Sequence, residues 1–458
     1  MGTAATTPTS SPLREGTGQQ LYRKAKRLIP GGAQLLGKRQ EMFAPEQWPT
    51  YFAEARGCEI TDLDGRKFTD LSMCGIGATV LGYADPDVSA AVIERVERGV
   101  MCTLNPPDEV ELAELMIELH PWAENVRFGR LGGETMAMAV RLARASTGRG
   151  KVAFCGYHGW HDWYLSANLP SDPDAEELED RLGNWHLLPG LQPAGIPRGL
   201  RGSAMPFTYN RLDELEAIVR DDGDDLAAIV MEPTRNMEPE PGFLESVRDI
   251  ARRCGARLVF DEVSIGWKLA TGGAHLRYGV EPDLAVFAKT TGNGHPITAV
   301  VGKADTMQAA QETFISSALW TEAVGPAAGA ACVKKMMRID VPAHLGKVGA
   351  YLQRRVWETA EAHDIPLTVS GHPAMPSFTF EHPQAAALQT LWTVRMLDHD
   401  YLASGTCHIM LAHEERHVDG FAKACDAVFP VLRDAIAAGD IEARINGPVK
   451  HSGLQRLN

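Results

Sequence analysis

The chain has 458 residues, of which 44% are hydrophobic and 23% are charged, and its formal net charge is −14. This composition is ordinary for a soluble globular protein with more than one domain, and the acidic balance argues against nucleic acid as the main partner. No apolar run reaches the roughly 18–20 residues that a membrane-spanning helix needs. The eight cysteines are scattered and contain no CxxC pair, which predicts reduced thiols in a cytoplasm.

The start of the chain is expected to contain a tail and a small N-terminal segment. Residues 1–19 are rich in Thr, Ser, Pro and Gly, which predicts a disordered tail, and they lack the basic start and apolar block of a signal peptide. The segment 20–85 is expected to begin with a helix over 20–29 that stops at a Pro–Gly–Gly sequence. Short strands are expected on either side of an Asp64–Gly65 turn.

Residues 86–326 are expected to form a large α/β domain. Helices over 86–99 and 108–119 come first, and short apolar runs then alternate with helical patterns. Strands are expected over 126–128, 152–154, 227–231, 258–262 and 284–289, and helices are expected from Gly132 and over 212–219 and 244–254. This alternation predicts a mainly parallel sheet between helices. The Pro- and Gly-rich stretch 171–202 is long enough to be a functional loop or insertion.

Residues 327–458 are expected to form a smaller α+β domain. Helical patterns cover 327–337, 344–363, 385–397 and 417–438, and short strands are expected near 367–369 and 377–380. No internal repeat is visible after the tail.

Four of the expected strands end on side chains that can do chemistry. In an open α/β sheet the ligand site lies outside the carboxyl ends of the strands. A charge at one strand end is usually only a solvated terminus, but several at the same edge predict a site. The residues at these ends are Tyr157 and His158, Glu232, Asp261 and Lys289.

The Gly132–Gly133 pair is a candidate phosphate seat. It follows an expected strand and opens an expected helix, where free backbone N–H groups and the helix dipole favour an anion. The chain has neither a G-x-G-x-x-G nor a G-x-x-x-x-G-K-[ST] sequence, so a dinucleotide or a P-loop nucleotide is not favoured.

Pyridoxal 5'-phosphate (PLP) suits this set of groups. A lysine amine forms a Schiff base with the aldehyde, and a carboxylate against the ring nitrogen keeps the pyridinium protonated so that the ring accepts electrons. An aromatic side chain can stack on the ring. A lysine in a dry pocket near cationic groups is a better nucleophile and base, because its pKa is lowered.

The sequence resembles class III (fold type I) PLP-dependent aminotransferases, and most of all their glutamate-1-semialdehyde aminomutase-like branch. The resemblance covers nearly the whole chain after the tail. It is carried by Phe260–Val263, Val286–Lys289 followed by Gly292–Pro296, Gly156–Gly159, Glu232–Pro233 with Asn236, and Pro241–Phe243. The resemblance implies a large domain with a mainly parallel sheet and a smaller α+β domain built from both chain ends.

The resemblance also implies a role for each matching residue. Lys289 would be the Schiff-base lysine and proton shuttle, Asp261 would pair with the pyridine nitrogen, and Tyr157 would stack on the ring. The backbone of Gly132 and Gly133 would seat the phosphate. Further expected site residues are His158 in a cofactor-side loop, Glu232 close to the substrate, and Thr321, which would reach the phosphate of the neighbouring subunit in a homodimer with shared active sites.

The chain departs from the family pattern in three places. The usual serine–glycine–threonine–glutamate–alanine phosphate turn is replaced by Leu131–Thr135, so that the serine and threonine hydroxyls are missing. Trp267–Lys268 stands where the family usually has phenylalanine–arginine. The motif around Thr321 lacks the common glycine–asparagine pair.

The expected reaction is transfer of an amino group from an amino-acid donor, such as glutamate, to a small keto or aldehyde acceptor. A cyclic or sugar-like ketone of a biosynthetic pathway is one such acceptor. Arg235 is a candidate for holding a substrate carboxylate, because its planar fork suits bidentate pairing. An aminomutase of the glutamate-1-semialdehyde type is the alternative, because the same cofactor residues serve both reactions.

A remote alternative comes from His413–Glu414–Glu415–Arg416–His417, which matches the H-E-x-x-H zinc pattern. On a helix the two histidines would share a face, as in a zinc hydrolase. No third ligand follows at short spacing, and the acidic residues suit the first turn of a surface helix. The sequence therefore favours no metal at this motif.

Overall fold

The computed structural model describes residues 16–169, 191–234 and 236–451. Most of the expected tail, much of the expected 171–202 insertion, and Arg235 lie outside the described residues. The chain divides into two compact units, one made of residues 1–74 and 348–458 and the other of residues 75–347. The first unit combines both chain ends, and the expected boundary after residue 326 falls inside the second unit.

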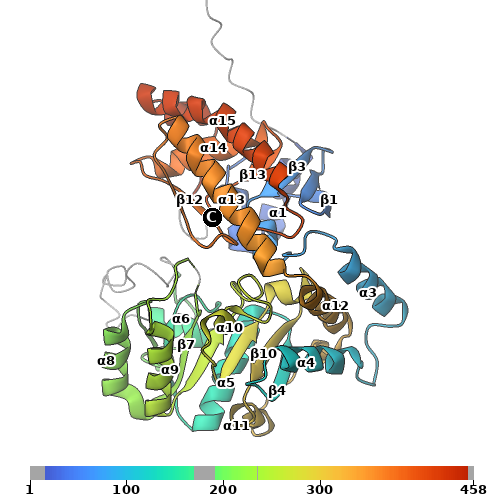
Figure 1. Cartoon of the computed structure of the whole chain (residues 1–458), viewed down its shortest axis with the longest axis vertical. Helices are drawn as coiled ribbons and strands as arrows, with labels where there is room; N and C mark the ends of the chain where they lie inside the picture. The colour runs from blue at the N-terminus through green and yellow to red at the C-terminus, as the bar shows by residue number, and fades with distance from the viewer. Residues whose placement is uncertain (1–15, 170–190, 235, 452–458) are drawn as a thin grey trace, which may run out of the picture. The chain divides into compact units, whose positions relative to one another are not determined.

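A seven-stranded sheet forms the centre of the unit 75–347 (Figure 1). Its strands lie in the order β4-β10-β9-β8-β7-β5-β6. Their bounds are β4 Asn125–Gly129, β5 Lys151–Cys155, β6 Ala204–Pro206, β7 Leu226–Met231, β8 Arg257–Asp261, β9 Leu284–Phe287 and β10 Thr298–Gly302.

Six of these strands run in one direction and β10 runs in the other. Strands β6, β5, β7, β8 and β9 pair in parallel with one another in that order, whereas β10 is antiparallel to both β4 and β9. The mainly parallel sheet is therefore confirmed. The sequence analysis did not predict β6 or β10, and it could not have given the reversed direction of β10.

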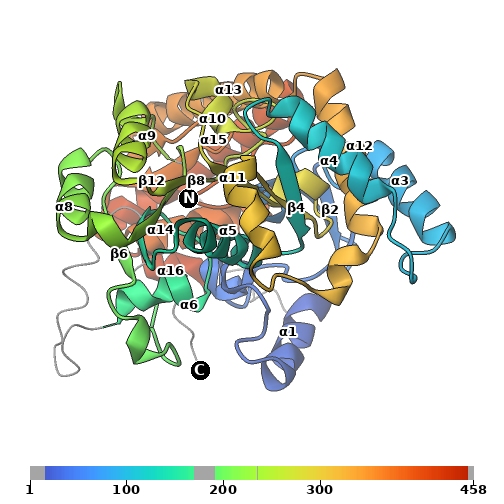
Figure 2. The same cartoon turned by 90° about the horizontal axis from the view of Figure 1, so that it is seen from below.

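Both faces of this sheet are covered because its strands are apolar on both sides. All six residues of β7 are buried, as expected for strands between two layers of helices. Helix α5 (Gly132–Thr147) packs on one face against residues such as Val230, Val259 and Val286. Helices α8 (Leu212–Asp222) and α9 (Phe243–Cys254) pack on the other face, and Figure 2 shows them side by side.

The other helices of this unit lie around the sheet. They are α2 (Cys74–Gly77), α3 (Pro86–Glu97), α4 (Asp108–Leu119), α6 (Asp162–Leu165), α10 (Ala274–Tyr278), α11 (Ala304–Met307) and α12 (Val324–Arg338). Helix α12 packs against α3 and α4. The expected helices at 86–99 and 108–119 are confirmed.

The unit made from both chain ends has two small sheets and several helices. Strands β1 (Phe52–Arg56), β2 (Glu59–Asp62), β3 (Lys67–Leu71) and β13 (Tyr401–Ala403) form one sheet, and β11 (Leu367–Ser370) pairs with β12 (Ser377–Phe380). The helices are α1 (Thr17–Leu28), α14 (Ala385–Leu397), α15 (Glu415–Ala438) and α16 (Ile441–Ile445), and α13 (Val341–Ala362) crosses the boundary between the units. Helix α1 starts inside the expected tail.

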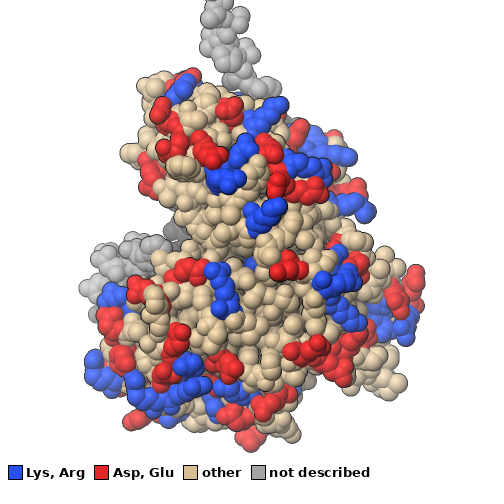
Figure 3. Space-filling view, in the orientation of Figure 1, with Lys and Arg blue, Asp and Glu red and all other residues tan. Residues whose placement is uncertain are grey.

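The distribution of charge on the surface and the character of the helices can be compared with the composition. Acidic and basic side chains are interspersed on the face drawn in Figure 3, with no large field of one sign. Among the residues described, no helix has the length and apolar character needed to cross a membrane.

Candidate active site

The carboxyl ends of the parallel strands bring the expected site residues to one edge of the sheet. Strands β5, β7, β8 and β9 are parallel neighbours or next neighbours, so the segments after them start at the same edge. Strand β4 has the same direction, and α5 begins three residues after it. Tyr157, His158, Glu232, Asp261 and Lys289 all belong to this edge, as does the Gly132–Gly133 turn.

Asp261 is a buried carboxylate in a fixed orientation, with only 2% of its surface exposed. Its Oδ1 accepts a hydrogen bond from the backbone N–H of Val263 at 2.9 Å. Its Oδ2 lies 2.7 Å from His158 Nδ1. His158 Nε2 in turn lies 3.1 Å from the carbonyl oxygen of Cys155, so that both ring nitrogens face oxygen atoms. The structure thus places His158 against Asp261 as its positioning partner.

Lys289 begins the short 3₁₀-helix η6 (Lys289–Gly292) that follows β9. Its backbone has φ of 47°, a left-handed conformation that residues with a side chain rarely adopt. Its Nζ donates a hydrogen bond to the hydroxyl of Ser264 at 2.8 Å. The sequence analysis missed Ser264, although its place three residues after Asp261, in the loop that follows β8, was a usable signal.

The segment around Lys289 is tied down by side-chain hydrogen bonds. Asn293 bridges two backbone groups, accepting from the N–H of Leu81 at 2.9 Å and donating to the carbonyl of Gly82 at 3.0 Å. Trp267 Nε1 donates to the hydroxyl of Thr291 at 3.1 Å. The Trp267 that departs from the family pattern therefore supports the turn that carries Lys289, and the buried Lys268 beside it donates to the carbonyl of Ser264.

The first turn of α5 presents backbone N–H groups at the same edge. The Glu134 carboxylate accepts from the N–H groups of Arg130, at 2.9 Å, and Leu131, at 3.3 Å. The N–H groups of Gly132 and Gly133 follow in the first turn, where a helix offers them no internal partner. A Cβ on Gly132 would lie 3.1 Å from the Val263 side chain, so a glycine suits this close packing.

His161 packs directly on this turn. A Cβ on Gly133 would lie 3.0 Å from His161 Nδ1 and 3.2 Å from its Cε1. The Nδ1 atom is buried and has no hydrogen-bond partner among residues 16–169, 191–234 and 236–451. Burial lowers the pKa of His161, which favours a neutral ring at neutral pH.

Tyr157 and Glu232 flank the same loop. Tyr157 is half-buried, and its ring meets that of Tyr164 edge to face, with 5.8 Å between the centroids. Glu232 is 4% exposed, and its Oε2 would lie 3.4 Å from a Cβ on Gly156, the residue before Tyr157. Arg235 lies outside the described residues, so its contact with a substrate stays a prediction.

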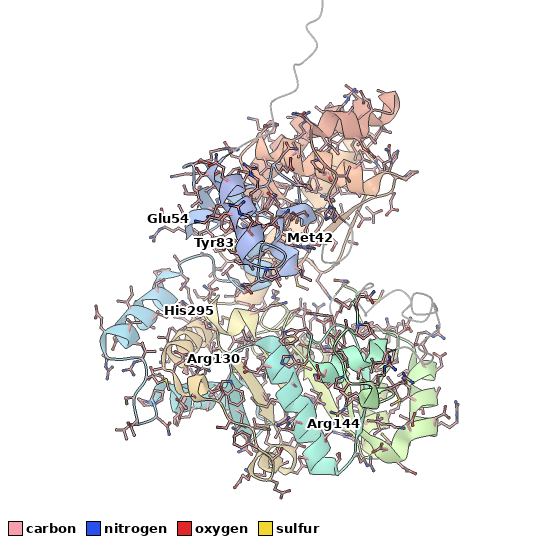
Figure 4. The ribbon with its side chains drawn as sticks, turned by 180° about the vertical axis from the view of Figure 1, so that it is seen from behind. Met42, Glu54, Tyr83, Arg130, Arg144 and His295 are labelled. Carbon is pink, nitrogen blue, oxygen red and sulfur yellow. The ribbon has the colours of Figure 1, made fainter. Side chains whose placement is uncertain are left out.

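Thr321 lies on a separate segment that is anchored near the start of α5. It ends the 3₁₀-helix η8 (Ala318–Thr321), and its hydroxyl donates to the carbonyl of Ala318 at 2.9 Å. Arg130, labelled in Figure 4, donates to the carbonyls of Trp320 and Glu322 at 3.0 Å each. The described contacts within this protomer do not join Thr321 to Asp261 or Lys289.

The two histidines of the H-E-x-x-H motif, His413 and His417, make hydrogen bonds to the protein backbone. Helix α15 begins at Glu415, so His413 precedes the helix and the two histidines do not share one helix face. His413 is fully buried, with Nε2 donating to the carbonyl of Asp70 at 2.8 Å and Nδ1 accepting from the N–H of Met410 at 3.0 Å. His417 Nδ1 accepts from the N–H of Glu414 at 3.0 Å. Both histidines are thus occupied by structural hydrogen bonds.

Comparison with known proteins identifies the family. The model of the family "Aminotransferase class-III" matches residues 42–405. The chain belongs to the class-III aminotransferase family. The match includes the expected PLP-site residues from Gly132 to Thr321, and the resemblance found in the sequence is confirmed.

Two relatives named for different activities each match this chain over most of its length. The chain is 31% identical over 422 residues to a 3-aminobutyryl-CoA aminotransferase of Cloacimonas acidaminovorans, covering 89% of this chain and 94% of that protein. It is 30% identical over 446 residues to a glutamate-1-semialdehyde 2,1-aminomutase of Methanothermobacter thermautotrophicus, covering 91% and 99%. The solved PLP internal aldimine form of the FumI protein of Sphingopyxis sp. MTA144 matches with a TM-score of 0.81 and 26% identity, covering 92% and 98%.

These matches make this class-III aminotransferase a PLP-dependent enzyme with the type I fold. The residues present are suited to that cofactor. The first turn of α5 offers amide donors for a phosphate, and His161 Nδ1, which has no partner among the residues that the structure describes, faces the same turn. A buried carboxylate and an amine lie at the neighbouring strand ends.

Proposed function

We propose that the protein is an aminotransferase that moves an amino group from an amino-acid donor, such as glutamate, to a small keto or aldehyde acceptor. The single observation that carries this proposal is that the buried Asp261 and Lys289 lie at the carboxyl ends of the adjacent parallel strands β8 and β9. The 3-aminobutyryl-CoA aminotransferase, which is 31% identical, supports transamination over other PLP reactions. An acceptor in a biosynthetic pathway, such as a cyclic or sugar-like ketone, remains the proposed class.

Each proposed role follows from the chemistry of a side chain and its surroundings. When bound, PLP supplies an aldehyde that condenses with amines and a ring that takes up electrons from the substrate carbon. With the cofactor bound, Lys289 Nζ, positioned by Ser264, would accept and return the proton of the substrate carbon. Asp261 supplies a buried negative charge that keeps the ring nitrogen protonated, and His158 positions it.

The remaining proposed contacts hold the cofactor or face the substrate. The amides of Gly132 and Gly133 bind the phosphate, and Tyr157 stacks on the ring. Glu232 lies at the same strand edge, where it restricts the space open to the substrate. Arg235 would bind a substrate carboxylate.

We also propose a homodimer with shared active sites, in which Thr321 reaches the phosphate of the partner subunit. Large exposed apolar side chains near Thr321 support this arrangement, since Phe314 is 83% exposed and Leu319 is 65% exposed. The eight free thiols support a cytoplasmic location.

The test uses the purified enzyme with its bound cofactor. Glutamate added alone should convert the cofactor to its amine form, with loss of the visible absorption band and release of one equivalent of 2-oxoglutarate per site. Addition of a keto or aldehyde acceptor should restore the band. An enzyme whose spectrum is unchanged by every amino-acid donor, including β-amino acids, would refute the aminotransferase proposal.

An aminomutase is the second candidate, because the chain is 30% identical over 99% of a glutamate-1-semialdehyde 2,1-aminomutase. A mutase returns the amine to the neighbouring carbon of the same molecule. It would therefore isomerise glutamate-1-semialdehyde to an amino ketone that keeps the nitrogen, without releasing a deaminated keto acid. Trapping of released 2-oxoglutarate with a coupled dehydrogenase distinguishes the two reactions.

A further inference from the structure

His161 is a histidine at the phosphate turn that the proposed mechanism does not use. It lies in the loop between β5 and α6, four residues after Tyr157. Its ring packs against the first turn of α5, where Gly133 replaces the threonine of the usual family sequence. The ring atoms Nδ1 and Cε1 fill the space that a side chain at 133 would occupy, at 3.0 and 3.2 Å from the position of its Cβ.

Two glycines make this contact possible. Gly159 has φ of 102°, and a Cβ there would lie 2.9 Å from the Cα of Gly133. The backbone of the 156–161 loop therefore lies directly on the first turn of α5, and neither position has room for a side chain. This close approach is what brings His161 to the helix terminus.

The unpaired nitrogen of His161 needs a partner. A buried polar atom without a hydrogen bond is uncommon, because desolvation without a compensating bond is unfavourable. Nδ1 has no partner among the described residues, yet it lies at the turn where free amides and the helix dipole favour an anion. Trp160, stacked at a tilt on the His161 ring with 4.6 Å between centroids, limits the ring's freedom to turn away.

We propose that His161 donates a hydrogen bond from Nδ1 to the phosphate of PLP, and so replaces the side-chain donor that the turn has lost at Gly133. This inference rests on the proposed phosphate seat at Gly132 and Gly133. His161 is a positioning residue, since it holds the cofactor and takes no part in proton transfer.

The first experiment measures binding of PLP and of pyridoxal, which lacks the phosphate, to the apoenzyme. His161→Ala should weaken PLP binding by about tenfold or more, because hydrogen bonds to charged groups are the stronger ones, and should leave pyridoxal binding unchanged. His161→Asn keeps an N–H donor close to the position of Nδ1 and should restore most of the PLP affinity. The ³¹P resonance of bound PLP should shift in His161→Ala and stay near the wild-type position in His161→Asn.

A second set of variants tests directly whether His161 replaces a side-chain donor at position 133. Gly133→Thr in the His161→Ala background has the space left by the ring and should recover PLP affinity through its hydroxyl. Gly133→Thr alone should weaken binding, because its Cβ would press on His161. Equal losses of PLP and pyridoxal affinity in His161→Ala, or no loss of either, would overturn the inference.

Hydrogen exchange of the 130–135 amides separates failure of this inference from failure of the proposed seat. If PLP protects these amides and pyridoxal does not, while His161→Ala binds PLP with unchanged affinity, the phosphate seat is retained and the histidine contact is rejected. Absence of PLP-induced protection in the wild-type enzyme would reject the seat itself.

Discussion

The left-handed backbone of Lys289 leads to a prediction that separates catalysis from stability. Lys289 has φ of 47° at the start of η6. A residue with a Cβ in this region is strained by about 1–2 kcal/mol, whereas glycine is not. Lys289→Ala and Lys289→Gly both remove the amine and its hydrogen bond to Ser264, so they differ only in the backbone preference at this position.

Both variants should lose turnover, and the glycine variant should be the more stable of the two. Loss of a general acid–base group alone costs about 10²–10⁴-fold in rate, so turnover should fall below about one part in a hundred. Relief of the about 1–2 kcal/mol of strain is offset in part by the about 0.5–1 kcal/mol that the larger loss of backbone freedom of glycine on folding costs, which leaves Lys289→Gly about 0.5–1 kcal/mol more stable than Lys289→Ala. That difference corresponds to about 1–4 °C in unfolding temperature for a domain of this size.

The assay compares the two apoproteins by calorimetry and by urea unfolding, next to turnover with a saturating donor and acceptor. Borohydride reduction of the wild-type holoenzyme followed by peptide mapping should place the cofactor on Lys289. Wild-type-like turnover in either variant would refute the role of Lys289. An alanine variant as stable as the glycine variant would refute the strain argument while leaving the catalytic role intact.

The remaining predictions concern neighbouring groups. Asp261→Asn should lower kcat by about a hundredfold or more, because it removes a buried charge, and stopped-flow spectra should show slow conversion of the cofactor; an unchanged rate would exclude the proposed charge pairing. Ser264→Ala should lower kcat by about fivefold through loss of one hydrogen bond to Lys289, with KM and unfolding temperature nearly constant; a stability loss without a rate effect would assign Ser264 to folding. Thr321→Ala should raise the PLP dissociation constant. A mixed dimer of one Thr321→Ala subunit and one Lys289→Ala subunit tests whether sites are shared, because shared sites would leave one site with both changes and the other with neither. Removal of PLP should lower the unfolding temperature, because the ligand stabilises only the folded state, and reconstitution should restore it; an apoprotein with the same unfolding temperature would contradict stabilisation of the folded chain by PLP.

Most of the site-bearing strands could be predicted from the sequence because of their composition. The run Leu258–Asp261 and the run Leu284–Phe287 are short, apolar and abruptly ended, and both are strands in the structure. Periodicity and composition therefore located the edge where Asp261 and Lys289 meet. The helix over 385–397 was also predicted with its observed bounds.

Pairing between distant segments could not be predicted from such patterns. The direction of β10 depends on its partners β4 and β9, and no local signal in Thr298–Gly302 encodes it. The contact of His158 with Asp261 joins residues 103 positions apart. Motif spacing placed both at the sheet edge but could not show that the histidine faces the carboxylate. The zinc interpretation of the H-E-x-x-H match, which the sequence analysis did not favour, requires His413 and His417 on one helix face, and the pattern alone could not show that α15 begins only at Glu415.

The reversed strand β10 bears on how this region can vary in evolution. Strands β9 and β10 are antiparallel neighbours, with Phe287 paired to Ala299, so residues 288–297 form a closed hairpin connection that begins and ends at the site edge. An inserted or deleted residue there would shift the register of β10 against two partners at once or displace Asn293 from its bridging bonds. Gaps in alignments of related enzymes should therefore avoid residues 288–297, and libraries designed to change substrate preference should keep this length constant while varying side chains elsewhere.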